Sequence, residues 1–183
     1  MMTRNRVRII AGTWRSRVIR FPPAAALRPT PDRVRETLFN WLGQRLDGLT
    51  CLDLFAGSGA LGFEALSRGA RRVVMVERDR AVAQALRASA KELDASGAEI
   101  VEGDSLKYLE RSAERFDVVF LDPPFASDLA AHALAALPAH LAAGARVYVE
   151  SGQPVESAAR WRTLREDRAG AVRYALLEPL ATP

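Results

Sequence analysis

Residues 51–65, CLDLFAGSGALGFEA, indicate the fold of this chain most directly. An apolar run ends in Gly57, Gly59 and Gly62, which have the spacing GxGxxG, and helix-forming residues follow at once. Glycine lets the backbone turn tightly after a strand and lets a ligand approach the start of the next helix. The stretch is therefore typical of a strand, a ligand-binding loop and a helix in an α/β domain.

The rest of the chain repeats this alternation. Apolar or β-branched runs occur at 50–55, 71–77, 98–103, 116–122 and 145–150, and stretches with helical spacing lie between them at 58–69, 79–96, 104–113 and 127–144. Such strands, separated by helices, are typical of a parallel sheet covered on both faces. We expect a single domain over residues 1–183 with a doubly wound, mostly parallel seven-stranded sheet.

The two ends of the chain do not follow this alternation of strands and helices. Residues 6–21 predict a small hairpin or extended arm, which forms part of a basic N-terminal arm over residues 1–27. A helix is expected next, with Thr30 as its N-cap and Pro31 at its first position. Residues 161–179 predict an antiparallel hairpin around an Asp-Arg-Ala-Gly turn, which closes the sheet.

Composition narrows the class of protein. The single cysteine excludes an internal disulfide, and with only two histidines beside it no zinc-binding spacing can be assembled. Cys51 lies in an apolar run and is expected to be a buried structural thiol. There is no apolar run of membrane-spanning length and no signal peptide, so we expect a cytoplasmic protein with no membrane partner.

Charge is distributed unevenly. Residues 1–36 contain nine arginines and only two acidic residues. Arginines that meet phosphates release counterions and so gain affinity without reading sequence. The basic N-terminal region therefore predicts a nucleic-acid partner.

Acidic residues after the strands favour one kind of cofactor. Glu77 ends the second body strand 20 residues beyond Gly57, where an acid accepts both hydroxyls of a ribose. Asp53 brings a carboxylate close to the glycine loop, which would repel a pyrophosphate but stabilise the sulfonium and ammonium of S-adenosyl-L-methionine. Asp104 and Ser105 follow the third strand, where they could hold the adenine, and Asp104 also suits a helix N-cap.

The tetrad Asp122-Pro-Pro-Phe125 closes the fourth strand, FDVVFL. The strand brings Asp122 to the carboxyl edge of the sheet, and the prolines make a rigid turn whose carbonyls are free to accept hydrogen bonds. The Asp122 carboxylate and the Pro123 carbonyl could hold both N–H groups of an exocyclic amine, and Asp122 could take its proton. Phe125 is expected to stack on the base. These residues predict methyl transfer to an amino group.

Together, the glycine loop, Glu77 and the acid after the third strand resemble the class I S-adenosylmethionine-dependent methyltransferases. The resemblance implies a sheet with an antiparallel final strand. It also implies cofactor contacts from Phe55, Gly57, Ser58, Gly59, Glu77, Asp104 and Ser105.

A longer set of motifs resembles one family more closely. RIIAGTWRSRVIRFP (8–22), RPTPDRVRETLFNWL (28–42), LDLFAGSGALGFEALSRGA (52–70), VERD (76–79), GDSLKYL (103–109), FDVVFLDPPF (116–125) and RVYVE (146–150) occur in the order found in the bacterial 16S rRNA guanine-N2 methyltransferases. The resemblance implies methylation of one guanine of the small ribosomal subunit and an arm that grips rRNA. It also implies that Arg28, Thr30 and Arg33 border the methionine end of the cofactor. The chain departs from the family at Ala11 and Ser16, where glycine is commoner.

Alternatives remain open from the sequence. The acceptor cluster serves any exocyclic amine, so a DNA or RNA adenine-N6 methyltransferase is one. An oxidoreductase that binds NAD through GxGxxG is another, and a non-catalytic RNA-binding assembly protein is a third. Because nothing in the sequence argues for an oligomer, we expect a monomer.

Overall fold

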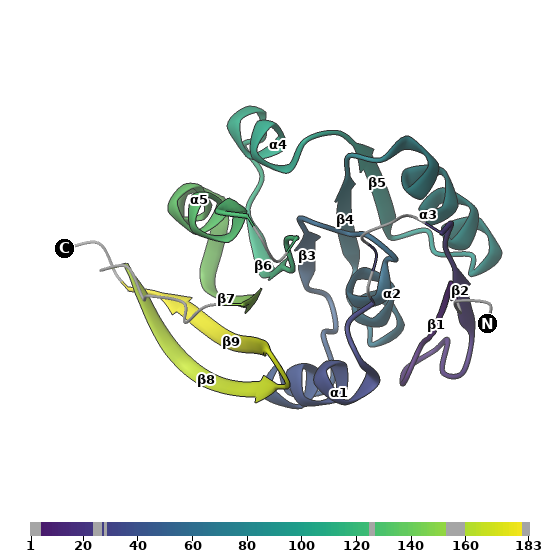
Figure 1. The fold of residues 1–183 in the computed structure, drawn as a ribbon, viewed down its shortest axis with the longest axis horizontal. Coiled ribbons are helices and arrows are strands. Elements are labelled where there is room, and N and C mark those ends of the chain that lie inside the picture. Colours follow the sequence, from purple (N-terminus) through teal and green to yellow (C-terminus); the bar gives the residue numbers. More distant parts are fainter. Residues whose placement is uncertain (1–4, 24–26, 28, 125–126, 153–159, 181–183) are drawn as a thin grey trace.

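A seven-stranded sheet forms the centre of the protein, as Figure 1 shows for a computed structural model that describes residues 5–23, 27, 29–124, 127–152 and 160–180. Five strands run parallel in the spatial order β5 (Ala98–Glu102), β4 (Arg72–Glu77), β3 (Thr50–Asp53), β6 (Phe116–Leu121) and β7 (Leu141–Ser151). The chain order reverses between β3 and β6, and ligands bind outside the carboxyl ends of the strands at such a point. The predicted doubly wound sheet is confirmed.

The last two strands complete the sheet. β9 (Val172–Pro179) runs antiparallel between β7 and β8 (Trp161–Ala169), so the predicted hairpin is confirmed. Because β8 continues to Ala169, the chain turns at Gly170 and Ala171, slightly later than the sequence suggested. Gly170 has a φ of +64°, a left-handed conformation that glycine adopts without strain.

Helices cover both faces of the sheet. One core includes side chains of α1 (Asp32–Trp41), α2 (Ala60–Ser67) and α3 (Arg80–Glu92), and the other includes side chains of α4 (Ser105–Arg111) and α5 (Leu129–Ala136). The strands serve both cores because successive side chains point to opposite faces. In β4, Val73 and Met75 enter the first core, whereas Val74 and Val76 enter the second.

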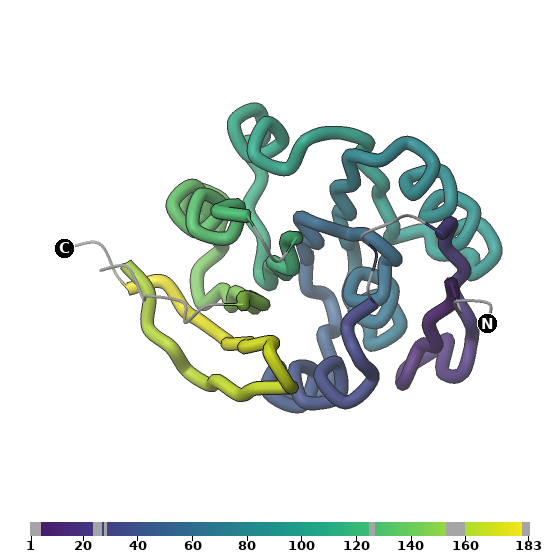
Figure 2. Tube along the Cα trace, viewed as in Figure 1, coloured from purple at the N-terminus to yellow at the C-terminus, as the bar shows by residue number. Residues whose placement is uncertain are grey.

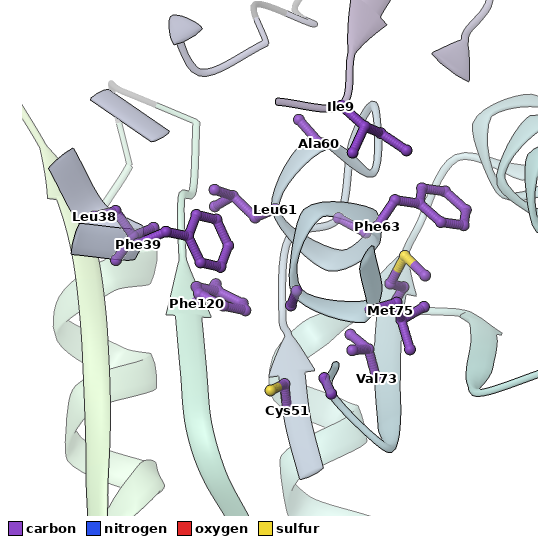
Figure 3. Close-up of a cluster of buried hydrophobic side chains, with 14 of the residues drawn as sticks. Ile9, Leu38, Phe39, Cys51, Ala60, Leu61, Phe63, Val73, Met75 and Phe120 are labelled. Atoms are coloured by element: carbon purple, nitrogen blue, oxygen red, sulfur yellow. The ribbon is translucent and has the colours of Figure 1, made fainter. Parts of the chain in front are cut away.

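Aromatic rings join α1 to the sheet. In the first core, shown in Figure 3, the ring centroids of Phe39 in α1 and Phe120 in β6 lie 6.0 Å apart. The Trp41 ring stacks on Tyr174 of β9, with ring centroids 5.4 Å apart. These contacts hold the C-terminal end of α1 against the sheet.

The N-terminal segment is a hairpin docked on the body. β1 (Arg6–Arg8) pairs antiparallel with β2 (Val18–Arg20), which confirms the predicted hairpin, and its inner side chains join the first core. The Glu64 carboxylate on α2 accepts hydrogen bonds from the backbone amides of Ile10 (2.8 Å) and Ala11 (3.0 Å). Figure 2 shows the hairpin and the C-terminal strands at opposite edges of the molecule.

Two local predictions were wrong. The helix expected over 127–144 ends at Ala136 and passes through a 3-10 turn, Leu137–His140, into β7, because Pro138 lacks the amide that would continue the helix. Thr30 does not cap α1: the N-cap position is Pro31, and the Thr30 hydroxyl instead donates to Asp122. The Thr30 side chain therefore binds a residue at the carboxyl edge of the sheet and not the start of the helix.

Other expectations concern single groups. Cys51 is fully buried in β3, and burial raises the pKa of its thiol to about 12, as suits the structural thiol that was predicted. Among the described residues, none of the helices has the length and apolar character needed to cross a bilayer. The same residues contain no cluster of three or more His, Cys, Asp or Glu suited to a metal ion.

Candidate active site

A cavity of about 770 Å³ opens at the carboxyl edge of the sheet. Its walls come from the loops that follow β3, β4, β5 and β6 and from the connector that precedes α1. A cavity of this size accommodates a ligand as large as a nucleoside derivative. Nine residues predicted from the sequence line it: Thr30, Phe55, Gly57, Ser58, Glu77, Asp104, Ser105, Asp122 and Pro123.

The glycine loop and Glu77 are joined directly. The Gly57 amide donates to Glu77 Oε2 (2.9 Å), and the Asp79 amide donates to Glu77 Oε1 (2.8 Å). Gly57 has a φ of +50°, a conformation that favours glycine and lets its amide turn back toward β4. The carboxylate is thus held at the cavity wall, and each oxygen keeps a further lone pair for a ligand hydroxyl.

Asp53 brings a buried charge to the same wall. Its side chain is 1% exposed, and its Oδ2 accepts a hydrogen bond from the Gly62 amide (3.1 Å). Burial raises its pKa to about 7, with the charge of Glu77 adding to the rise and the Gly62 amide opposing it. A Cβ on Gly62 would lie 2.7 Å from Met75 Sδ, so glycine also allows α2 to pack closely on β4.

The loop after β5 supplies another polar wall. Asp104 caps α4, because its Oδ1 accepts a hydrogen bond from the Lys107 amide (3.0 Å), and its exposed side chain also borders the cavity. The predicted N-cap role of Asp104 is therefore confirmed, and its adenine contact stays a prediction. Ser105, the first residue of α4, is buried beside it on the same wall.

Asp122 also lines the cavity, together with Pro123 and Pro124. Its Oδ2 accepts a hydrogen bond from the Thr30 hydroxyl (3.2 Å). Burial raises the pKa of Asp122 well above its usual range, the charges of Glu150 and Asp53 raise it further, and the Thr30 hydrogen bond opposes them. In the described part of the chain, no ion pair joins an arginine or lysine to Asp122 or Asp53.

Two predicted site residues are not on the cavity wall, and two others lie outside the described residues. Gly59 is the N-cap of α2, and its space is filled by Leu86 and Phe63 rather than by the cavity. Arg33 is exposed on α1 and is not on the cavity wall; its charge acts on Asp167 and Tyr174 of the C-terminal hairpin. Arg28 and Phe125 lie outside the described residues.

Glu150 was missed as a site residue. It is 4% exposed in β7, and its Oε1 accepts a hydrogen bond from the Tyr148 hydroxyl (2.9 Å). The sequence signal was a strand, ARVYVE, that ends in an acid as the strands before Glu77 and Asp122 do. Only the alignment of β7 with β6 reveals that this acid lies beside Asp122.

β9 runs antiparallel in this sheet, which distinguishes the sheet from those of the all-parallel dinucleotide-binding domains. The antiparallel strand and the cavity at the reversal of chain order between β3 and β6 together define a class I methyltransferase fold. The chain belongs to the family described as "Conserved hypothetical protein 95", whose model matches residues 7–178.

Relatives cover nearly the whole chain. It is 44% identical over 183 residues to "Ribosomal RNA small subunit methyltransferase D" of Haemophilus influenzae, across 96% of this chain and 95% of that protein. It is 44% identical over 180 residues to the protein of the same name from Escherichia coli strain K12, across 95% and 90%. A structure described as a putative methyltransferase from Escherichia coli superposes with a TM-score of 0.87 at 43% identity, covering 97% of this chain and 99% of that one.

Proposed function

We propose that this protein transfers a methyl group from S-adenosyl-L-methionine to the exocyclic N2 amine of a guanine in 16S rRNA of the small ribosomal subunit. The observation that carries the proposal is a pair of carboxylates on the walls of one cavity, the buried Asp53 and the half-buried Asp122, which have no partner cation among the described residues. A cationic ligand relieves their repulsion, whereas the pyrophosphate of a dinucleotide would add to it. When bound, S-adenosyl-L-methionine supplies an electrophilic methyl group on a sulfonium.

The walls suit the remaining parts of that cofactor. Glu77 accepts the ribose hydroxyls, and Phe55, Gly57 and Ser58 shape the loop beneath them. Asp104 and Ser105 hold the adenine end. Thr30 lies on the cavity wall, and we assign it to the methionine end of the cofactor together with Arg28. Arg33 is exposed and not on this wall, and its cofactor contact stays a prediction.

The acceptor amine is held at the turn after β6. Asp122 and the Pro123 carbonyl accept its two N–H groups, which frees the nitrogen lone pair from the ring and aims it at the methyl carbon. Asp122 receives the proton that the nitrogen sheds. Phe125 stacks on the extruded base, as apolar side chains do in enzymes that act on flipped bases.

Binding of rRNA is assigned to the N-terminal hairpin. Arg6 pairs directly with Arg20 across the two strands, and both are exposed together with Arg8 on the outer face. Like charges placed opposite each other repel, and phosphate between them relieves the repulsion. The names of the relatives, which specify small-subunit rRNA, support the substrate, and we propose that the protein acts as a cytoplasmic monomer.

Methylation of small ribosomal subunits from a strain that lacks this protein tests the proposal. The purified protein should transfer tritiated methyl groups to 16S rRNA, and mass mapping of nuclease fragments should place them on the N2 amine of one guanine. Label on adenine or DNA alone would favour the adenine-N6 alternative.

Two further measurements test the alternatives from other classes. S-adenosyl-L-methionine should raise the melting temperature more than NAD does, and the reverse order would favour an oxidoreductase. Asp122→Ala should abolish rRNA methylation in cells, whereas unchanged methylation would favour a non-catalytic assembly role.

A further inference from the structure

Glu150 and Asp122 occupy matching positions on neighbouring parallel strands. Leu121 of β6 pairs with Val149 of β7, and the two acids are the next residues of their chains. Adjacent residues in register on parallel strands direct their side chains to the same face. The two carboxyls are therefore neighbours at the carboxyl edge of the sheet, where Glu150 is buried and Asp122 is half-buried at the cavity wall.

Hydroxyl groups link the pair to its surroundings. Thr30 Oγ1 donates to Asp122 Oδ2 (3.2 Å) and also stabilises the ionised form of Glu150. The Tyr148 hydroxyl donates to Glu150 Oε1 (2.9 Å). A threonine hydroxyl has only one proton to donate, so it cannot satisfy two ionised carboxylates at once.

The charges around the pair favour one ionised and one neutral carboxyl. Burial raises the pKa of both acids, and the Glu150 charge further raises that of Asp122. Asp53 adds negative charge from β3, while Tyr174 pairs with Glu150 from β9 and acts on Tyr148. In the described residues no arginine or lysine contributes to either shift. Two neighbouring carboxyls in such a setting, one buried and one half-buried, share one proton.

We propose that Glu150 is a positioning residue that holds one proton jointly with Asp122 while the cavity is free, and that a cation in the cavity drives this proton out. Glu150 keeps the charge in that state because the Tyr148 hydroxyl donates to Glu150 and not to Asp122, so the proton resides on Asp122. The inference rests on the proposed function, since S-adenosyl-L-methionine is the cation.

The pair then balances charge during methyl transfer. The nitrogen lone pair forms the N–C bond, and the S–C bond breaks with its electron pair left on sulfur. The positive charge on sulfur is thereby lost, and the proton shed by the nitrogen passes to Asp122. The carboxyl pair returns to its one-proton state as the cation disappears, so no net charge accumulates in the buried site.

Calorimetric titration of the whole protein tests the inference through proton release. S-adenosyl-L-methionine and S-adenosylhomocysteine, which lacks the sulfonium charge, are each titrated at neutral pH in two buffers of different ionisation enthalpy. The methyl donor should release up to about one proton more per site than S-adenosylhomocysteine does. Equal proton release by the two ligands overturns the inference.

Variants test whether the extra proton release depends on Glu150. Glu150→Gln removes the neighbouring charge, so Asp122 ionises without help and the extra release should fall, while the acid limb of the activity profile moves to lower pH by about one unit or more. Tyr148→Phe removes a hydrogen bond that stabilises ionised Glu150, so the same limb should move to higher pH. The Glu150-dependent release should persist in Asp53→Asn, because Asp53 is a separate buried acid.

A matched control is Glu110→Gln, which removes one negative charge from an exposed position on α4 and should change neither proton release nor pH profile. If Glu150→Gln lowers activity equally at every pH with unchanged proton release, Glu150 is merely structural and the inference fails. A native protein that binds the methyl donor without extra proton release contradicts this inference alone. Failure to bind the methyl donor at all would also overturn the proposed function.

Discussion

Arg35 donates through Nη1 to Glu64 Oε2 across 3.2 Å, and neither side chain is exposed to solvent. Arg68 donates to the other Glu64 oxygen (2.8 Å), and two amides of the N-terminal hairpin bind the same carboxylate. One buried acid therefore ties the hairpin, α1 and α2 together. Its ionised form is fully satisfied, which is the condition under which a buried charge is tolerated.

Glu64→Gln should lower the free energy of unfolding by about 3 kcal/mol or more, because it leaves the buried Arg68 without its carboxylate partner and the buried Arg35 with Asp32 alone. The hairpin should also detach more readily, so trypsin should cleave after Arg15 or Arg17 faster than in the native protein. Urea denaturation and timed proteolysis measure the two effects. Glu110→Gln is the control, and an unchanged denaturation midpoint in Glu64→Gln would show that the cluster contributes no net stability.

Glu77→Ala should weaken S-adenosyl-L-methionine binding by about 10- to 100-fold, because the hydrogen bonds of a charged carboxylate to the ribose are lost. Glu102→Ala, at the end of the neighbouring β5, is the matched control, since Glu102 is not on the cavity wall and pairs with Arg87. Calorimetry measures both affinities. If both variants lost the same affinity for S-adenosyl-L-methionine, Glu77 would not be a cofactor-binding residue.

Asp53 should make cofactor affinity and stability respond to pH in opposite directions. Its folded pKa of about 7 lies above its ordinary value, so folding takes up a proton between those two values and stability falls as pH rises through this window. Above about pH 7 the ionised carboxylate attracts the sulfonium, so cofactor affinity should rise from about pH 6 to about pH 8.

Asp53→Asn should therefore stabilise the free protein at pH 8, by up to about 4 kcal/mol, and flatten the pH dependence of cofactor affinity. Thermal melts and titrations over the same pH range provide both readouts. A variant that is less stable than the native protein at pH 8 would contradict the assignment of a strained charge to Asp53.

Asp122→Ala should reduce kcat by about 10²- to 10³-fold, a larger effect than the loss of cofactor affinity that follows from removing one of the two carboxylates, because the aspartate also acts on the acceptor amine. Asp122→Asn keeps an acceptor oxygen for one N–H group and should lose less activity than the alanine variant. Single-turnover methylation of small subunits measures the step. A loss confined to KM would assign Asp122 to substrate binding only.

The double variant Arg6→Ala/Arg20→Ala should weaken binding to small ribosomal subunits and lower the slope of log K against log salt by about 2, if each arginine meets one phosphate. Lys107→Ala/Arg111→Ala removes the same charge from exposed positions on α4 and serves as the control. Filter binding over a salt series measures the slope. If both double variants changed the salt slope equally, the N-terminal hairpin would not be a specific RNA-binding element.

Much of the fold could be predicted because it depends on local pattern. Alternating strand and helix runs gave the sheet, and GxGxxG gave the loop whose residues Phe55, Gly57 and Ser58 do line the cavity. The overlong helix prediction over 127–144 shows the limit of periodicity, since Pro138 ended a pattern whose apolar spacing continued.

The sequence by itself determined which residue types end the strands: an acid at Asp53, Glu77, Asp122 and Glu150, each at or next to the carboxyl edge of the sheet. Tertiary structure alone decided which of these acids meet. The pairing of β6 with β7 places Glu150 beside Asp122. The path of the connector before α1 places the Thr30 hydroxyl where it donates to Asp122 and does not cap the helix. Register and loop path depend on contacts between segments distant in the chain, so no local pattern encodes them.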